Sequence, residues 1–430
     1  MKSLTSLVAA VLLLAACSTS KPPRAPFTTD GERARQIDAR VVAVGYPKQD
    51  SIEQLTKRLI AGLDDERERL YAIHRWTSRY IEYDVEGYLA GQWRASHGAV
   101  ETYQTGKALC DGYAELVMAM GKVAGFEIKK VTGYAKGFGQ LPATASPQKE
   151  NHAWNAVKLG GRWHLLDATW DAGGVDDATR RFVRRPEGPP AYFLASPAAF
   201  ITTHFPADRQ WQLLAQPVAF SSFLGKVAQR PDLARWGLDI SRHADERITA
   251  AAAPYVFDFG SDRRMQAALS RPAGVPEQPW SLQVRTSEGS RLLLAAPEAG
   301  EYQVAIYVAE NPTDMLLQPA LNYQVRFDSS SRYENGFPQT YGGYYARKVE
   351  LVSPLDGRLE AGKPVPFKLR SQGSRQMTVF QGNEVVSELK EQDGYFVGLV
   401  ELPPGRIDLA AIHEGESDYA GILTYQAVGP

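Results

Sequence analysis

Cysteine and net charge are both scarce in this sequence. The 430 residues include only 2 cysteines, and 48 basic against 49 acidic residues leave a formal net charge of −1. Without a basic excess, the composition does not favour a nucleic acid or an anionic membrane surface as a partner. The sequence also lacks the histidine and cysteine spacings of metal sites and the glycine-rich loops that bind phosphates. It therefore predicts no metal and no cofactor.

Long hydrophobic runs are absent except near the N-terminus, where residues 7–16 are all apolar and follow the basic Lys2. This run is too short to span a bilayer stably and is typical of a secretory signal peptide. It leads into Leu14-Ala15-Ala16-Cys17-Ser18, which resembles the lipobox of bacterial lipoproteins. The resemblance implies that residues 1–16 are cleaved, that Cys17 is lipidated, and that residues 17–45 form a tether.

Ser18, directly after this cysteine, resembles the pattern that is sorted to the outer membrane of Gram-negative bacteria. We therefore expect a lipid-anchored protein of the cell envelope that faces the periplasm. The alternative is an ordinary signal peptide followed by a chance cysteine.

The second cysteine, Cys110, would have no intramolecular disulfide partner once Cys17 is lipidated. An unpaired thiol in an exported protein is exposed to oxidation, so its presence calls for a functional reason. Apolar residues after Cys110 are spaced as one helical face, and Gly125 is a natural stop, which predicts a helix that begins near the cysteine. The backbone N–H groups at a helix N-terminus favour the thiolate, the nucleophilic form of cysteine.

Apolar periodicity predicts two earlier helices, over residues 51–62 and 64–81. His74 lies beside the apolar stripe of the second helix and is expected to be a packing or surface residue. Residues 82–106 show no clear period and are expected to form loops.

A β-hairpin is predicted over residues 151–170. Two strand-like runs meet at Gly160-Gly161, and such a two-residue turn matches the twist of paired strands. The turn pairs Leu159 with Arg162, and this pairing sets the register of the whole hairpin.

The register places Trp154 opposite Asp167 and His152 opposite Thr169. His152 and Asp167 are then diagonal neighbours on one face, within reach of each other's side chains. His164 points to the other face and is expected to be structural. A thiol needs a nearby base, and the base needs an acceptor that orients its ring, so the hairpin supplies both partners for Cys110.

Several motifs resemble known families. Three motifs resemble those of the transglutaminase-like superfamily, whose core is papain-like: residues 109–116 (LCDGYAEL), 151–155 (NHAWN) and 165–171 (LLDATWD). Two later segments resemble its kyphoscoliosis-peptidase branch, namely residues 191–194 and 204–214. The resemblance covers roughly residues 71–214. It implies an α+β papain-like catalytic domain, which we place at residues 46–215.

The resemblance also implies a role for each member of the triad: Cys110 is the nucleophile, His152 the general base and acid, and Asp167 the orienting group. The oxyanion donor remains open. Gln104 precedes the nucleophile by six residues, a spacing similar to the papain-like glutamine. Trp93 is the rival, since transglutaminases proper use an upstream aromatic donor, and the backbone N–H of Cys110 is available in either case.

The C-terminal half changes character. Short strand-like runs at regular spacing, separated by proline and glycine turns, predict antiparallel β-sandwiches. We expect a linker and a first immunoglobulin-like module over residues 216–325 and a second module over residues 326–430. Five tyrosines in this half could form a surface that stacks on a sugar or a peptide: Tyr323, Tyr333, Tyr341, Tyr344 and Tyr345. The simpler interpretation is that they are ordinary strand and loop tyrosines.

Two functions fit these observations. The first is a cell-envelope cysteine peptidase or transglutaminase-type acyl-transferase that cleaves amide bonds of a protein or peptide through a thioester. The motifs do not separate hydrolysis from transfer. The second is a non-catalytic, lipid-anchored scaffold whose sandwich modules hold an envelope protein or a glycan.

Overall fold

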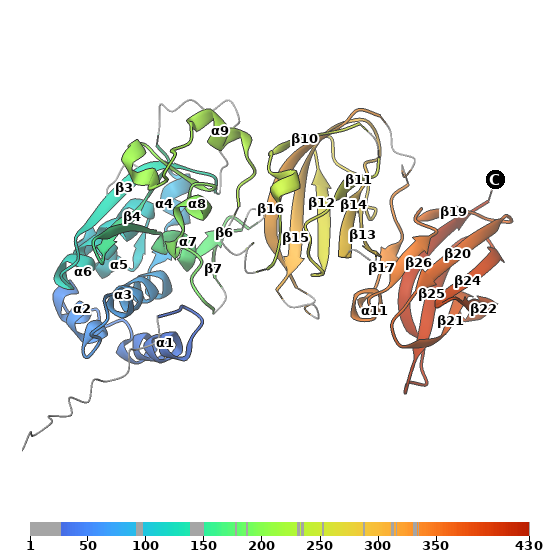
Figure 1. Cartoon of the computed structure of the whole chain (residues 1–430), viewed down its shortest axis with the longest axis horizontal. Coiled ribbons are helices and arrows are strands. Elements are labelled where there is room, and N and C mark those ends of the chain that lie inside the picture. Colours follow the sequence, from blue (N-terminus) through green and yellow to red (C-terminus); the bar gives the residue numbers. More distant parts are fainter. Residues whose placement is uncertain are drawn as a thin grey trace, which may run out of the picture.

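A computed structural model describes residues 27–91, 98–137, 150–176, 179–185, 188–229, 233, 236–251, 253–286, 289–310, 314, 316–329, 333 and 335–429. Three parts follow one another along its long axis (Figure 1). An N-terminal domain of helices around one sheet is followed by two β-sandwiches, as the sequence predicts. The expected cleavage and lipidation sites, with Cys17, lie outside the described residues.

Two predicted helices form close to their expected positions, as α2 (Ile52–Ile60) and α3 (Glu66–Tyr80). Side chains cap both N-termini. Ser51 and Gln54 form a capping box at α2, while Asp65 accepts hydrogen bonds from two backbone N–H groups of α3. These caps fix the start of each helix close to where the apolar period predicts it.

The segment expected to be a tether up to residue 45 is helical from Glu32. α1 (Glu32–Val44) buries Ala34, Ile37 and Val41 in the same hydrophobic cluster as α2 and α3. Arg33 also forms an ion pair with the buried Glu68. The helix therefore belongs to the N-terminal domain, because its apolar face packs against the core.

The domain is built on a five-stranded sheet in the order β8-β5-β4-β3-β9. Its strands are β3 (Ile128–Ala135), β4 (His152–Leu159), β5 (Arg162–Leu166), β8 (Phe193–Ala195) and β9 (His204–Pro206). α6 (Cys110–Val123) packs on it, and its Leu116, Val117 and Met120 share a core with Val157 and Leu166. The sheet and α6 together place the candidate site.

The described residues between 82 and 106 contain more regular structure than predicted. They contain α4 (Val85–Leu89) and α5 (Ala99–Thr105), and β1 (Glu82–Tyr83) pairs in parallel with β2 (Lys107–Ala108). Elements of two to seven residues are too short to show a hydrophobic period, which is why the sequence favoured loops.

Short elements complete the domain and lead out of it. They are α7 (Ala168–Ala172), β6 (Gly173–Val175), β7 (Phe182–Arg184), α8 (Pro197–Phe200), the 3-10 helix η1 (Arg209–Gln212) and α9 (Phe220–Gly225). Lys136, just after β3, donates hydrogen bonds to the backbone oxygens of Leu224 and Lys226 and to Glu246 Oε2. This buried ammonium group joins the domain to the start of the first sandwich.

The first sandwich follows the 3-10 helix η2 (Ser241–His243). One sheet has the order β10 (Arg247–Ala250), β16 (Leu317–Phe327), β15 (Gly300–Ala309) and β12 (Met265–Ser270), and the other β11 (Tyr255–Phe257), β14 (Gly289–Leu294) and β13 (Ser281–Thr286).

The second sandwich begins with an edge strand, which is followed by α11 (Gly342–Ala346). One sheet contains β17 (Gln339–Thr340), β26 (Ala420–Val428), β25 (Gly405–His413), β21 (Ser374–Gln381) and β22 (Glu384–Glu388), with β19 (Arg358–Glu360) also paired to β26; the other contains β18 (Glu350–Ser353), β20 (Pro364–Arg370), β24 (Tyr395–Glu401) and β23 (Lys390–Gln392).

The two sandwiches share one hydrophobic cluster. Trp280 and Leu282 of the first pack in the same cluster as Tyr344 and Leu351 of the second, and the Tyr344 hydroxyl donates to the backbone oxygen of Gln283. Three of the five tyrosines considered for a sugar- or peptide-binding surface are at most 2% exposed, namely Tyr323, Tyr333 and Tyr344. They are ordinary buried tyrosines. A glycan or protein partner of these modules stays a prediction.

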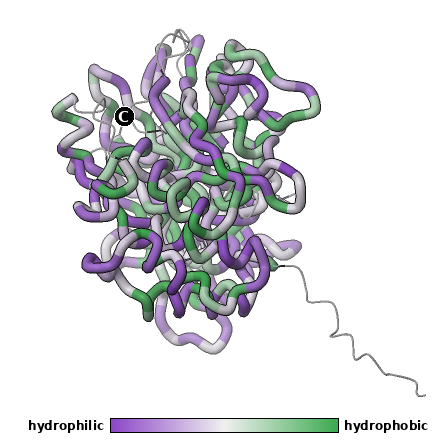
Figure 2. Tube along the Cα trace, turned by 90° about the vertical axis from the view of Figure 1, so that its left-hand side faces the viewer, coloured by the Kyte–Doolittle hydropathy of each residue, from purple (hydrophilic) through white to green (hydrophobic). Residues whose placement is uncertain are grey.

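Figure 2 views the chain from the end of the N-terminal domain. Hydrophilic and hydrophobic residues alternate along the trace, the pattern of elements that bury one face. Among the described residues, no helix combines the length and apolar character that a membrane span needs.

Candidate active site

Cys110 is the first residue of α6, as the sequence predicted, and its side chain is partly exposed. No side chain caps this helix: Leu109 holds the N-cap position. The first backbone N–H groups of α6 therefore remain available to a developing negative charge. Tyr113, one turn later, donates its buried hydroxyl to the backbone oxygen of Ile81 and so anchors α6 to the end of α3.

The predicted hairpin register is confirmed at the turn, where Leu159 pairs with Arg162, and it continues to Asn155 and Leu166. The ladder ends there. The expected pairings of Trp154 with Asp167 and of His152 with Thr169 are wrong, because the chain turns into α7 after Leu166.

Asp167 is the N-cap residue of α7. Its Oδ1 accepts hydrogen bonds from the backbone N–H groups of Thr169 and Trp170, at 2.8 and 3.2 Å. Its own N–H donates to the backbone oxygen of Tyr192. The same carboxylate therefore caps α7 with one oxygen and contacts His152 with the other.

His152 and Asp167 meet as the sequence predicted, although through the turn rather than across a ladder. His152 Nε2 lies 2.7 Å from Asp167 Oδ2, and both side chains are nearly inaccessible to solvent. The remaining ring nitrogen of His152 is left for Cys110, which lies close enough to this imidazole to raise its pKa. The structure thus brings Cys110, His152 and Asp167 together in that order.

Charge within this group is strongly stabilised. Burial opposes ionisation of Asp167, but His152 and His204 outweigh burial and hold the pKa of its carboxyl well below the usual range. Burial likewise opposes charging of His152, yet the Asp167 carboxylate and then Cys110 raise the pKa of His152 to about 10. The imidazolium form of His152 therefore predominates near neutral pH.

A second histidine, His204 on β9, was missed by the sequence analysis. Its Nε2 lies 3.1 Å from Asp167 Oδ2, the same oxygen that His152 contacts, and its Nδ1 lies 2.8 Å from Thr203 Oγ1. The segment containing His204 was singled out as part of the family resemblance, but 37 residues separate it from Asp167. Only the β3–β9 pairing, with Ala135 opposite His204, brings it to the site.

Aromatic side chains surround the two imidazoles. The Trp170 ring lies 5.5 Å from that of His152 and 4.4 Å from that of His204, between ring centroids. Trp154 and Phe200 cover His204 at 5.1 and 4.2 Å. This cage excludes water from the Asp167 contacts and strengthens their electrostatics.

His74 belongs to a second buried pair rather than to the surface. Its Nε2 lies 2.8 Å from Asp171 Oδ2 on α7, and neither side chain is exposed. Asp171 also accepts hydrogen bonds from the N–H groups of Ala191 and Tyr192. Because the Tyr192 oxygen receives the Asp167 N–H, this pair supports the orienting carboxylate. His164 lies on β5, outside this network, and is partly buried.

The candidate oxyanion donors separate in the structure. Gln104 is an exposed residue of α5, and Trp93 lies outside the described residues. Tyr83, which pairs with Ala108 just before the nucleophile, was not considered from the sequence. Burial, and next the charge of Cys110, raises the pKa of Tyr83 above its usual value, so its phenol stays protonated near the thiol.

The donor atoms of His152, Asp167 and His204 lie within 4.8 Å of one another and could surround a metal ion. Their mutual hydrogen bonds already account for this closeness. Both Nε2 atoms are committed to Asp167 Oδ2, and Nδ1 of His204 is committed to Thr203. This arrangement fits a hydrogen-bonded carboxylate better than a set of metal ligands.

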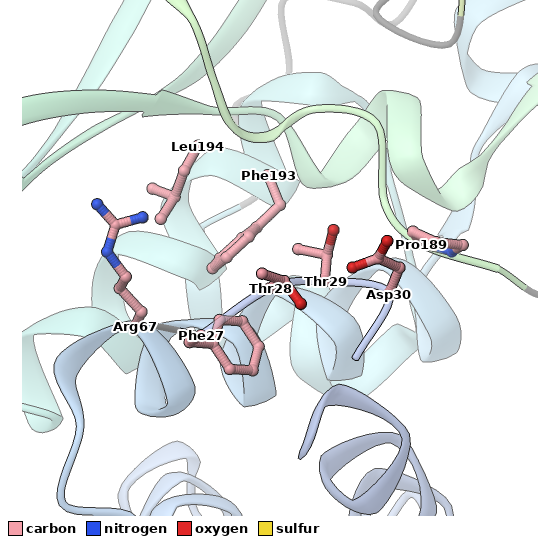
Figure 3. Close-up of a pocket in the computed structure, with 8 residues that line it drawn as sticks. All are labelled: Phe27, Thr28, Thr29, Asp30, Arg67, Pro189, Phe193 and Leu194. Atoms are coloured by element: carbon pink, nitrogen blue, oxygen red, sulfur yellow. The ribbon is translucent and has the colours of Figure 1, made fainter. Parts of the chain in front are cut away.

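A separate cavity of about 330 Å³ lies between the segment before α1, the start of α3 and the strand β8 (Figure 3). It is lined by Phe27, Thr28, Thr29, Asp30, Arg67, Pro189, Phe193 and Leu194. The close-up shows the segment before α1 lying beside Phe193, whose ring also contacts His74 at 5.2 Å. Cys110 and His152 do not line this cavity.

Residues 53–168 match the family profile of the transglutaminase-like superfamily. The chain carries a transglutaminase-like domain. Kyphoscoliosis peptidase from Mus musculus is 36% identical over 358 residues, covering 80% of this chain and 50% of that protein. The Homo sapiens protein of the same name is 35% identical over 385 residues, covering 86% and 54%.

This chain spans about half the length of the curated relatives it matches. Among solved structures, one titled "Crystal structure of a TGase" is 16% identical with a TM-score of 0.23, and the alignment covers 32% of each chain. The profile match on the transglutaminase-like domain includes Cys110, His152 and Asp167 and ends before His204.

Proposed function

We propose that the protein is a cysteine hydrolase or acyl-transferase that acts on amide bonds. The observation that carries this proposal is the 2.7 Å contact between His152 Nε2 and Asp167 Oδ2, with Cys110 close enough to the same imidazole to raise its pKa. A thiol, a base and an orienting carboxylate in this order are what nucleophilic catalysis by cysteine requires.

The geometry supports the following sequence of steps. The Cys110 thiolate attacks the carbonyl carbon of an amide, and the backbone N–H of Cys110 at the start of α6 stabilises the oxyanion. His152 then gives its proton to the departing amine nitrogen, and a thioester remains on Cys110. Water or a second amine attacks the thioester while His152 takes up a proton, which yields an acid or a new amide.

The test compares wild type with Cys110→Ala, using a peptide library for hydrolysis and labelled amines for transfer. Turnover should be lost in Cys110→Ala and in His152→Ala. His164→Ala is the matched control, because His164 is a histidine of the neighbouring strand outside the network. It should keep wild-type turnover. Equal product from wild type and Cys110→Ala would refute the proposal.

The alternative is a non-catalytic scaffold, which the two packed sandwiches would suit. It predicts that Cys110→Ser leaves the role in the cell intact. A folded Cys110→Ser protein that behaves like a gene deletion contradicts the scaffold.

We also propose that the protein is anchored to the cell envelope through Cys17. The support is the short apolar run that ends in Leu14-Ala15-Ala16-Cys17. Labelled palmitate should enter the wild-type protein and not Cys17→Ala. An unlabelled, soluble wild-type protein contradicts the anchor.

A further inference from the structure

We propose that His204 is a positioning residue that acts through Asp167. As a neutral imidazole it donates its Nε2–H to Asp167 Oδ2 and so limits how firmly that carboxylate holds the proton of His152. This inference rests on the proposed function of the Cys110-His152-Asp167 triad.

The proton positions follow from the contacts. Asp167 Oδ2 is a carboxylate oxygen and only accepts, so both imidazoles must present a protonated Nε2 to it, at 2.7 Å from His152 and 3.1 Å from His204. In a neutral His204 the other nitrogen, Nδ1, is then a bare acceptor. The Thr203 hydroxyl lies 2.8 Å from Nδ1 and 3.3 Å from the Phe200 backbone oxygen, and in a neutral His204 its single hydrogen is donated to the nearer Nδ1.

Its surroundings keep His204 neutral. The side chain is fully buried, and the rings of Phe200, Trp170, Trp154 and Tyr192 lie 4.2 to 5.4 Å from it. Burial lowers the pKa of His204 to about 4, against the opposing effect of Asp167. A second charge is also disfavoured because the His152 ring, which is charged, lies only 5.2 Å away.

The neutral donor has a chemical consequence. Asp167 receives four N–H groups, two from the backbone at Oδ1 and two from imidazoles at Oδ2. Each hydrogen bond spreads part of the negative charge, so Oδ2 attracts the His152 proton less strongly than it would alone. A general acid must release its proton to the departing amine, and His204 keeps His152 acidic enough to do so.

The other charged or titratable groups that act on this cluster come from neighbouring elements. They are Cys110 of α6 on His152, and Tyr83 of β1 and Tyr113 of α6, whose phenols are protonated and interact with Asp167. These phenols are neutral across the working range, so they do not contribute to the cluster's pH response below pH 9.

The first experiment observes the protons directly. The chain contains 7 histidines, so ¹⁵N-histidine labelling of the full-length protein gives a spectrum that single substitutions can assign. We expect His204 to remain the neutral Nε2–H form from pH 8 to pH 5, and His152 to be doubly protonated at pH 7. A charged His204 at pH 6, or a neutral Nδ1–H form, overturns the inference.

The second experiment uses a matched pair of variants. His204→Phe keeps an aromatic ring in the cage but removes the donor, whereas His204→Gln retains an amide N–H that reaches toward Asp167. The titration of His152 should move upward by at least half a pH unit in His204→Phe and by less than 0.2 units in His204→Gln. No shift, a downward shift, or equal shifts in both variants overturns the inference.

Steady-state kinetics of the same variants test whether His204 affects catalysis. kcat should fall about tenfold in His204→Phe with little change in KM, and His204→Gln should restore most of it. The titrations need no substrate, so a protein without turnover would refute the proposed function while leaving the test of His204 intact. Unaltered titrations in an active enzyme would refute only the role of His204.

Discussion

The Nε2 atom of His152 lies 2.7 Å from Oδ2 of Asp167, and neither side chain is more than 7% exposed. The two residues are 15 positions apart and flank a hairpin whose turn is Gly160-Gly161. Breaking a contact of this kind, between a buried charged carboxylate and an imidazole, costs folding free energy because each partner would be left buried without the other.

Replacing Asp167 with asparagine should disable the site without a large change in shape. The amide would present an N–H₂ group or a neutral oxygen to the two Nε2–H donors, so His152 would lose its ionic partner and its fixed tautomer. We expect turnover to fall about 10²- to 10⁴-fold. The rate of iodoacetamide alkylation at Cys110, measured in the Cys17→Ala background, should fall in parallel. Unchanged alkylation would show that Asp167 does not act on the thiol.

Stability should fall between pH 6.5 and pH 4 because of His204. Burial lowers the folded pKa of His204 to about 4, so the unfolded chain binds a proton in this range that the folded protein does not. The folded state therefore loses stability as pH falls from about 6.5 toward 4, by up to roughly 3 kcal/mol.

The check compares wild type with His204→Gln by hydrogen exchange of the β3 and β4 amides at pH 6.5 and 4.5. The variant lacks the titrating group, so its loss of protection should be smaller than that of wild type. Carboxylates such as Asp167 contribute equally to both proteins. Equal losses would mean that His204 is charged in the folded state.

Gly133→Ala should damage the junction of the strands that carry the two histidines. Gly133 lies opposite both His152 and Pro206, and an added Cβ would lie 2.2 Å from the Phe205 backbone oxygen. We expect a destabilisation of about 1–3 kcal/mol, measured by urea unfolding, together with loss of turnover. Gly174→Ala is the control, because a Cβ there meets nothing within 4 Å.

Lys136→Met should loosen the connection between the transglutaminase-like domain and the first sandwich. The ammonium group donates to two backbone oxygens and lies 3.1 Å from Glu246 Oε2. Its loss leaves that carboxylate without its partner. Limited proteolysis between residues 215 and 246 should become faster. Lys158→Met, which breaks the exposed ion pair with Glu127, should leave the cleavage rate unchanged.

The sequence by itself determined the features that depend on near neighbours. Apolar periodicity located α2 and α3, Gly160-Gly161 set the register of a hairpin, and the spacing after Cys110 placed the nucleophile at the start of α6. Short strands between proline and glycine turns were enough to predict the sandwiches. Each signal acts within a few residues, so it survives without knowledge of the rest of the chain.

Only the tertiary structure decided which distant groups share the buried carboxylate. His204 reaches Asp167 across 37 residues because β9 pairs with the far side of β3, and no local pattern encodes that sheet order. The same holds for α1, which resembles a tether until its apolar face meets the core, and for Tyr344, which the packing of two sandwiches buries. Such contacts join segments that carry no joint signal in the sequence, and their partners are chosen by packing of the whole domain.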